Sequence, residues 1–364
     1  MRAVLASWPA LGLAFLLLVL FAWQPIAWQQ AGLPWMTLVV TFVLIPLADH
    51  CIGAPRQAVP HAQTAWARWL PRAHLPLQTV LIGWACTVAP GLAPLGVLTL
   101  GLAVGTVTGG LGITLAHELG HRAGRLDRAI ARLLLWMVGY GHFQVEHIRG
   151  HHVRVATDAD PASAPRGMGV YRFVARSLWG SWRHAWALEA MRLRHQGRSA
   201  WHWRNEVLAS NLLSLVLLVA VTLAWGPAAG ALWLVQAAWA VFLLESVNYI
   251  EHYGLRRARV PGAHTAGFEP VRPEHSWNAD FALSNALLFN LQRHSDHHAR
   301  MNKPWETRAT HDDAPQMPAG YPAMLPLAWV PPLWHAVMDA RLDRWHAARV
   351  TQAARAAQAP TGAA

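Results

Sequence analysis

Six long apolar stretches constrain this chain more than any other feature of its sequence. A helix that crosses a bilayer needs about 20 predominantly apolar residues. Segments 9–23, 33–48, 75–92, 95–115, 207–225 and 229–250 approach or reach this length. Charged residues make up 13% of the chain, against about 25% in soluble domains. The sequence therefore predicts an all-α integral membrane protein with six transmembrane helices.

The distribution of basic residues predicts the orientation of these helices. The connections expected on the outer side, 24–32, 91–93 and 226–228, contain no Lys or Arg, so all 30 basic residues fall on the other side. Basic residues mark the cytoplasmic side of a membrane protein. We therefore expect both termini on the cytoplasmic side. This topology explains the net charge of +11 without a nucleic-acid partner.

The remaining segments complete the predicted organisation. The apolar stretch 130–143 is too short to cross and should lie in or dip into the interface. The segment 154–204 is basic and rich in tryptophan and should pack on the membrane surface. We expect one membrane-embedded domain over residues 1–332. A C-terminal tail over 333–364 should be partly disordered.

Four histidine clusters lie on the predicted cytoplasmic side, close to the ends of the spans. The first is His117-Glu118-Leu119-Gly120-His121, whose histidines stack on one helical face and can reach one metal. In the second, on an α-helix, His147 and His151 share a face, and His152 lies about 100° round toward another metal. The third ends the sixth span with His252. The fourth contains His294, His297 and His298.

Nine histidines exceed the four to six ligands that a single metal uses. They divide naturally over two metals that keep open positions for oxygen. Imidazole suits zinc, copper, iron and nickel. Because zinc has no redox chemistry, the pattern favours iron, and the spacing leaves copper open. Cys51 and Cys86 are too few for an iron–sulfur site, so any iron–sulfur electron carrier must be a separate protein.

Acidic residues adjoin the four clusters. A ligating histidine usually donates its other ring N–H to a carboxylate or a carbonyl. We expect this supporting role for Glu118, Glu146, Glu251 and Asp296, with solvated charges or ion pairs to arginine as the simpler explanation and direct ligation as a further one. His275 is a further candidate for this supporting role. The other histidines are expected to be solvated or interfacial.

These segments resemble the signatures of bacterial membrane alkane 1-monooxygenases, within the wider group of membrane fatty-acid desaturases and hydroxylases. The resemblance rests on His-Glu-Leu-Gly-His-Arg (117–122), Glu-His-Ile-Arg-Gly-His-His (146–152), Asn-Tyr-Ile-Glu-His-Tyr-Gly-Leu (248–255) and Leu-Gln-Arg-His-Ser-Asp-His-His-Ala (291–299). The last two are far more specific than the general histidine boxes. The likeness also includes 152–157, 160–162 and 275–278.

The resemblance implies a di-iron centre with nine histidine ligands, which uses O2 to hydroxylate the terminal carbon of an n-alkane. The electrons would come from rubredoxin and its NAD(P)H-dependent reductase. The implied ligands are His117, His121, His147, His151, His152, His252, His294, His297 and His298. An alkane partitions into the bilayer, so a channel should lead from the lipid to the metals. Thr41, Phe42 and Trp84 are candidates for the end of this channel.

Four alternatives remain open from the sequence. An alkyl-aromatic hydroxylase of the xylene type would share all the ligands. A fatty-acyl desaturase would differ only in its product. A membrane zinc protease could use His117, His121 and the general base Glu118, but it leaves seven clustered histidines without a role. A transporter or metal carrier should place its ligands near the middle of the bilayer instead.

Overall fold

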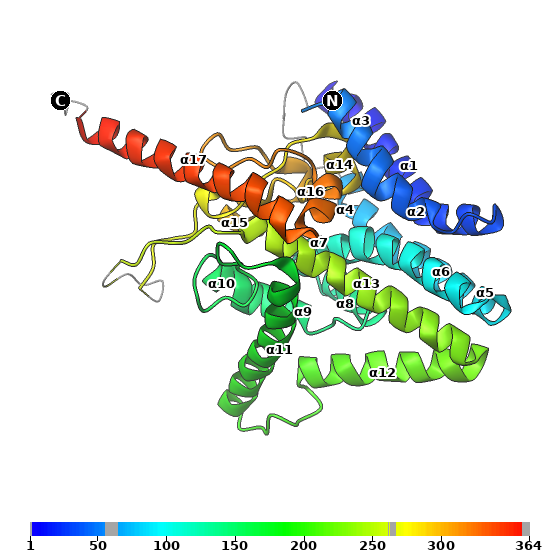
Figure 1. Cartoon of the computed structure of the whole chain (residues 1–364). Coiled ribbons are helices and arrows are strands. Elements are labelled where there is room, and N and C mark those ends of the chain that lie inside the picture. The colour runs from blue at the N-terminus through cyan, green and yellow to red at the C-terminus, as the bar shows by residue number, and fades with distance from the viewer. Residues whose placement is uncertain (1, 55–64, 261, 263–266, 359–364) are drawn as a thin grey trace.

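The computed structural model describes residues 2–54, 65–260, 262 and 267–358 of the chain (Figure 1). These residues form helices joined by loops, and two isolated β-bridges, Arg259–Phe268 and Asn278–Gln316, are the β-structure within them. The all-α prediction is confirmed. The helices are α1 (Arg2–Gln30), α2 (Met36–Val39), α3 (Ile45–Ile52), α4 (Ala65–Trp69), α5 (His74–Val88), α6 (Pro94–Val107), α7 (Thr114–Gly120), α8 (Arg125–Trp136), α9 (Phe143–Glu146), α10 (His152–Arg154), α11 (Val170–His195), α12 (Glu206–Trp225), α13 (Pro227–His252), α14 (Ala282–Leu287), α15 (His294–Ala299), α16 (Tyr321–Ala328) and α17 (Pro331–Gln358).

Single turns of other helix types interrupt or extend this set. Three are π-helical: Val40–Leu44, Thr108–Ile113 and His147–His151. Four are 3₁₀-helical: Leu70–Ala73, Ala89–Gly91, Pro273–His275 and Trp305–Thr307. Because the first two π-turns continue the helices on either side of them, 36–52 and 94–120 are each one rod. Such π-turns are rare and frequently lie at functional sites.

Each predicted apolar segment corresponds to a helix, and several helices run beyond the predicted ends. Among the residues described, three helices are long and apolar enough to cross a bilayer: Pro94–Gly120, Glu206–Trp225 and Pro227–His252. Phe15–Gln30 and Met36–Ile52 are shorter apolar helices. These helices make the chain a membrane protein, and the count of six spans stays a prediction.

Helix α13 lies at the centre of the bundle and packs closely on α6. A Cβ atom on Gly105 would lie 2.7 Å from the Gln236 carbonyl oxygen, and one on Gly109 would lie 2.8 Å from Ala240 Cα. Neither distance is possible for a real side chain, so glycine is required at both positions. Small residues four apart allow helix backbones to approach in this way in membranes. The close approach fixes the helices that carry His117 and His252.

The segment predicted to lie in the interface forms α8, an amphipathic helix. Ile130 and Leu134 are buried, whereas Arg125 and Arg128 are exposed. Its last carbonyl groups are not left unpaired. Gln78 Nε2 donates to the Leu134 carbonyl oxygen at 3.2 Å, as buried backbone groups require.

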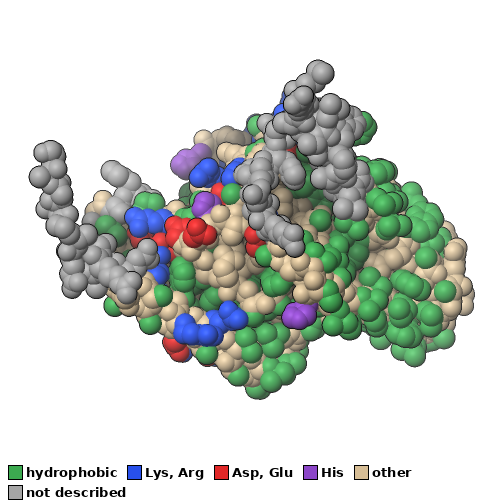
Figure 2. All heavy atoms as spheres, turned by 90° about the horizontal axis from the view of Figure 1, so that it is seen from above, with side chains coloured by type: hydrophobic (Ala, Val, Ile, Leu, Met, Phe, Trp, Pro, Cys, Tyr) green, Lys and Arg blue, Asp and Glu red, His purple; other side chains and the backbone are tan. Residues whose placement is uncertain are grey.

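Charged side chains gather over one half of the face drawn in Figure 2, and hydrophobic side chains cover the other half.

The described part of the predicted tail belongs to α17. Its Trp334, Met338 and Leu342 are fully buried and pack in a cluster with Tyr249 and Tyr253 of the bundle. The beginning of this segment is therefore part of the folded domain. Residues 359–364 of the predicted tail lie outside the described residues.

Candidate metal centre

The structure brings all nine candidate histidines together at one end of α7 and α13. They fall into two adjacent groups, and within each group the ligand nitrogens lie within 4.8 Å of one another. Group A consists of His117, His121, His147, His152 and His297, and group B consists of His151, His252, His294 and His298. The rings of His152 and His298, one from each group, have centroids 4.5 Å apart.

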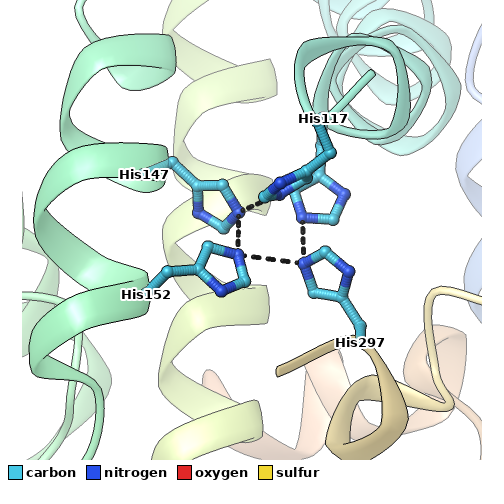
Figure 3. A group of neighbouring side chains, drawn as sticks. His117, His147, His152 and His297 are labelled. Carbon is cyan, nitrogen blue, oxygen red and sulfur yellow. Dashed lines mark hydrogen bonds between the residues drawn. The ribbon is translucent and has the colours of Figure 1, made fainter. Parts of the chain in front are cut away.

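In group A the Nε2 atoms point toward a common centre (Figure 3). His117 Nε2 lies 2.9 Å from His297 Nε2, and His147 Nε2 lies 3.0 Å from His121 Nε2. His152 Nε2 lies between these two pairs, 3.0 Å from His147 Nε2 and 3.1 Å from His297 Nε2. Helix α7 with its C-cap residue His121, the segment 147–152 and helix α15 each contribute to group A.

Group B has the same construction. His151 Nε2 lies 3.3 Å from His298 Nε2, and His294 Nε2 lies 3.2 Å from His252 Nε2. His252 comes from the last residue of α13, whereas His294 and His298 lie four residues apart on α15. All four side chains are buried.

The π-turn decides how the second histidine cluster is divided. The α-helical spacing predicted that His147 and His151 share a face and that His152 turns toward a second metal. The rings of His147 and His151 do stack, with centroids 5.3 Å apart, but the predicted division between the metals is wrong. In a π-helix the bonded residues are five apart, so His147 and His152 point into group A and His151 points into group B. By contrast, His117 and His121 share group A, as their α-helical spacing predicts.

The donor set fits two transition-metal ions. A neutral imidazole carries one N–H, so several Nε2 atoms facing one centre suit a metal better than they suit hydrogen bonds to one another. Burial, followed by repulsion from neighbouring histidines, lowers the pKa of His147, His152 and His298 well below the usual value. These residues are therefore neutral at pH 7, which is the ligating form.

Asp160 supports His151, a role that its position in the sequence did not predict. Its Oδ2 atom accepts a hydrogen bond from His151 Nδ1 at 2.9 Å and another from Ser163 Oγ at 2.6 Å. Burial alone would lower the pKa of His151, but the Asp160 carboxylate outweighs this effect and the net pKa is raised. This contact leaves His151 Nε2 free for a metal. Spacing alone gives no signal for it, because Asp160 lies on a loop eight residues beyond the cluster.

Replacing Asp160 by asparagine should weaken metal binding in group B. Carboxylates that hold ligating histidines contribute about 10- to 100-fold to metal affinity, so we expect a loss of roughly tenfold in a competition titration with a chelator. Asp158→Asn is the matched control, because the Asp158 carboxylate is 83% exposed. Equal affinities in the two variants would contradict the role of Asp160.

The four carboxylates next to the clusters have different partners in the structure. Glu118 accepts a hydrogen bond from Arg308 at 2.6 Å. Glu146 Oε1 lies 2.9 Å from His184 Nδ1. Asp296 accepts a hydrogen bond from Lys303 at 2.5 Å. None of these contacts involves a histidine of either group. Glu251 is different: its Oε2 atom lies 3.2 Å from His294 Nε2, while Oε1 accepts from Tyr321 Oη at 2.8 Å. Glu251 is therefore placed to approach a metal in group B.

His275 lies outside both groups. Its Nε2 atom is 3.2 Å from Glu269 Oε1 and 3.8 Å from Glu274 Oε1. Arg349 forms two hydrogen bonds to Glu274, at 2.5 and 2.7 Å. The arginine therefore neutralises this carboxylate, and the cluster ties α17 to the loop that precedes α14.

An apolar cavity within the helix bundle extends to both histidine groups. Its walls come from the rods 36–52 and 94–120, from α13, and from the segments around α14 and α16. His117 and His147 of group A and His294 of group B border it. Thr41 and Phe42, the proposed channel residues on the second segment, line this cavity. Trp84 is not among the lining residues and packs against the bundle core on α5.

The comparisons with known proteins agree with this site. A family model described as fatty acid desaturase matches residues 92–328. Alkane 1-monooxygenase 2 of Pseudomonas aeruginosa is 40% identical over 89% of this chain and 86% of its own length. Alkane 1-monooxygenase 1 of the same species is 42% identical over 85% of this chain and 83% of its own length. The xylene/toluene monooxygenase hydroxylase component of Pseudomonas putida is 30% identical over 67% of this chain and 64% of its own length.

The chain therefore belongs to the fatty acid desaturase family and, within it, to the alkane 1-monooxygenases. It is an oxidoreductase of the monooxygenase class. The resemblance found in the histidine motifs is confirmed over most of the chain.

Proposed function

We propose that this protein hydroxylates the terminal carbon of n-alkanes to 1-alkanols at a di-iron centre held by groups A and B. The observation that carries the proposal is the apolar cavity that borders histidines of both groups. Leu111, Leu243 and Leu291 contribute to its walls, and such walls suit a substrate without polar groups. The higher identity to alkane 1-monooxygenases than to the xylene/toluene enzyme favours an unbranched chain over an aromatic ring.

In this reaction the residues of the chain bind the alkane, orient it and exclude water. The cavity holds the alkane with one end at the histidines, so the walls select which carbon is presented and keep bulk water away. The nine imidazoles would hold the two irons, and Asp160 fixes the ring of His151. When bound, the irons would supply the activation of O2. Overall, RH, O2, two electrons and two protons give ROH and water.

The structure supports one entry side for the electrons. Of the nine histidines, His121 is the one that is partly exposed. It lies in a basin lined by five basic residues, Arg68, Arg72, Arg122, Arg128 and Lys303, and by three acidic ones, Glu118, Asp127 and Glu306. A neighbouring groove shares Arg128 and adds Arg125, Arg132 and Arg149 against one acidic residue, Glu206, so basic residues are in excess in both. We propose that rubredoxin, an acidic carrier reduced by its NAD(P)H-dependent reductase, docks over this basin beside His121.

Removing charge from the rim should weaken this docking. Arg125 and Arg128 are exposed on α8, and neither guanidinium has a hydrogen-bond or ion-pair partner among the described residues. Complementary charge raises association rates and is screened by salt. In the double variant Arg125→Gln/Arg128→Gln we expect about a tenfold rise in the KM for rubredoxin at low salt, with kcat little changed. Arg344→Gln on α17 is the control, and a flat salt response of the unaltered enzyme would remove the docking idea.

The activity itself can be tested with purified components. Membranes containing the protein are incubated with rubredoxin, reductase, NADH, O2 and a series of n-alkanes, with xylene and a fatty acyl substrate in parallel. We expect 1-alkanols as the main products. An alkene would indicate a desaturase, preferential turnover of xylene would indicate the alkyl-aromatic enzyme, and one bound zinc with proteolysis would indicate a protease.

The bacterial inner membrane is the proposed location, with both termini and the metal centre on the cytoplasmic side. The arginine-rich basin and the histidine groups lie at the same end of the bundle. This agrees with the positive-inside rule.

A further inference from the structure

Four tryptophans form a row of ring contacts along α11 and the turn that leads into α12, and a fifth, Trp203, lies in the same turn. Trp179 and Trp182 stack with ring centroids 5.7 Å apart, and Trp182 and Trp186 stack at 5.8 Å. Trp201 meets Trp186 edge-on at 5.0 Å, and Trp203 follows two residues later. We call these five residues the tryptophan shelf.

The shelf is open on its outer side. The side chains of Trp179, Trp201 and Trp203 are 62%, 72% and 72% exposed. Trp182 and Trp186 are partly buried and pack against the cluster that contains Val145, Leu188 and Val207. Since Val207 is the second residue of α12, the inner edge of the shelf lies at the end of a membrane helix.

The direction of α11 places the shelf at the membrane boundary. In Figure 1, α11 runs steeply across the direction of α12 and lies beyond its first turn. The outward side chains of α12 are apolar and exposed, among them Leu212, Val216 and Leu223. The exposed rings therefore continue a lipid-facing surface at the level where tryptophan is enriched in membrane proteins.

The exposed charged side chains on residues 170–205 all belong to arginine. Residues 170–205 contain seven arginines and one acidic residue, Glu189. Glu189 is fully buried and bonded to Arg149 and Arg192. Two exposed arginines lie over exposed shelf rings: Arg183 Cζ is 5.9 Å from the Trp179 centroid, and Arg204 Cζ is 5.0 Å from the Trp203 centroid.

We propose that the tryptophan shelf lies in the headgroup layer of the membrane and that Arg183 and Arg204 bind the phosphates of anionic phospholipids. The rings supply the amphipathic surface that this layer favours. Both arginines are exposed beside these rings, and the carboxylates near them are engaged elsewhere: Glu189 is buried, and Glu206 pairs with Arg132 at 2.7 Å.

The shelf also reaches the second histidine segment. Glu189 on the buried side of α11 holds Arg149 at 2.6 Å, and His184 Nδ1 on the same helix lies 2.9 Å from Glu146 Oε1. Arg149 and Glu146 flank His147. A bilayer that fixes α11 therefore also steadies the segment that supplies His147, His151 and His152.

The depth of the shelf can be measured by electron paramagnetic resonance. In the background Cys51→Ser, a nitroxide is attached at Trp203→Cys, at Trp179→Cys in a second protein, and at Arg344→Cys on α17 as the control. Cys86 is buried and should not be labelled. In nanodiscs, we expect the shelf labels to collide more with lipid-soluble O2 and less with a water-soluble nickel complex than the control label does.

Two results would overturn the placement. Nickel accessibility at both shelf positions equal to that at position 344 would put the shelf in water. Low accessibility to both reagents, together with dipolar broadening between labels, would show that a second copy of the chain covers the shelf instead.

The phosphate contact is tested with the full-length protein in detergent. Phosphatidylglycerol should raise the Tm of the unaltered protein more than phosphatidylcholine does. In Arg183→Gln/Arg204→Gln the apparent affinity for phosphatidylglycerol should fall by about fivefold per arginine removed, whereas Arg344→Gln should leave it unchanged. Equal responses of the unaltered protein to the two lipids would refute the arginine contact. This result is independent of catalysis.

Discussion

Replacing His298 by alanine should remove the metal of group B and reduce alkane hydroxylation by more than about 100-fold. Outer partners of ligating histidines already contribute about 10- to 100-fold, and a ligand itself should contribute more. His298 Nε2 lies 3.3 Å from His151 Nε2, and its ring packs against His252 and His294. The iron content, measured by mass spectrometry of the purified variant, should fall from two per chain to about one.

His142→Ala is the matched control for this experiment. His142 is buried, as His298 is, but it belongs to neither group. Burial lowers the pKa of His142 to about 4, so both histidines are neutral at pH 7. Because His142 is not a proposed ligand, the His142 variant should keep two irons. Retention of two irons and full turnover in the His298 variant would exclude group B as a metal site.

Filling the cavity at Gly110 should shorten the range of alkanes that the enzyme accepts. Gly110 lines the cavity, and a Cβ atom added there would meet nothing within 4 Å. The residue lies seven positions before His117, which is about 10 Å along the helix axis. In Gly110→Phe, the ratio of hexadecane to octane turnover should fall by about tenfold or more, while the iron content stays at two.

A second glycine separates this effect from a general effect of the mutation. Gly83 on α5 also has open space at its Cβ position, but it does not line the cavity. Gly83→Phe should keep the chain-length profile of the unaltered enzyme. A Gly110 variant with an unchanged profile would show that the substrate does not occupy this part of the cavity.

The sequence was sufficient to predict the helices and the identities of the clustered histidines. Long apolar segments reveal helices directly, because each residue adds to the same signal. His117 and His121 are four residues apart on an α-helix, so their shared group follows from local geometry. The proximity of His252 to α15 was implied by the family resemblance and not by spacing, because it depends on tertiary packing.

The parts that the sequence did not predict depend on departures from regular structure or on long-range contacts. The π-turn at His147–His151 moves His151 into group B, and no propensity reveals it. Asp160 reaches His151 across a loop. Glu118 pairs with Arg122, four residues on, but also with Arg308, 190 positions away, so its neighbourhood in the sequence revealed only one of its two partners.

In the proposed site, nine imidazoles would hold two redox-active metal ions. The decisive test is Mössbauer spectroscopy of the active protein, purified after growth on ⁵⁷Fe and combined with an iron count per chain. We expect two irons per chain with the signature of a coupled pair. A single uncoupled iron, or one zinc in their place, in a preparation that still hydroxylates alkanes would contradict it.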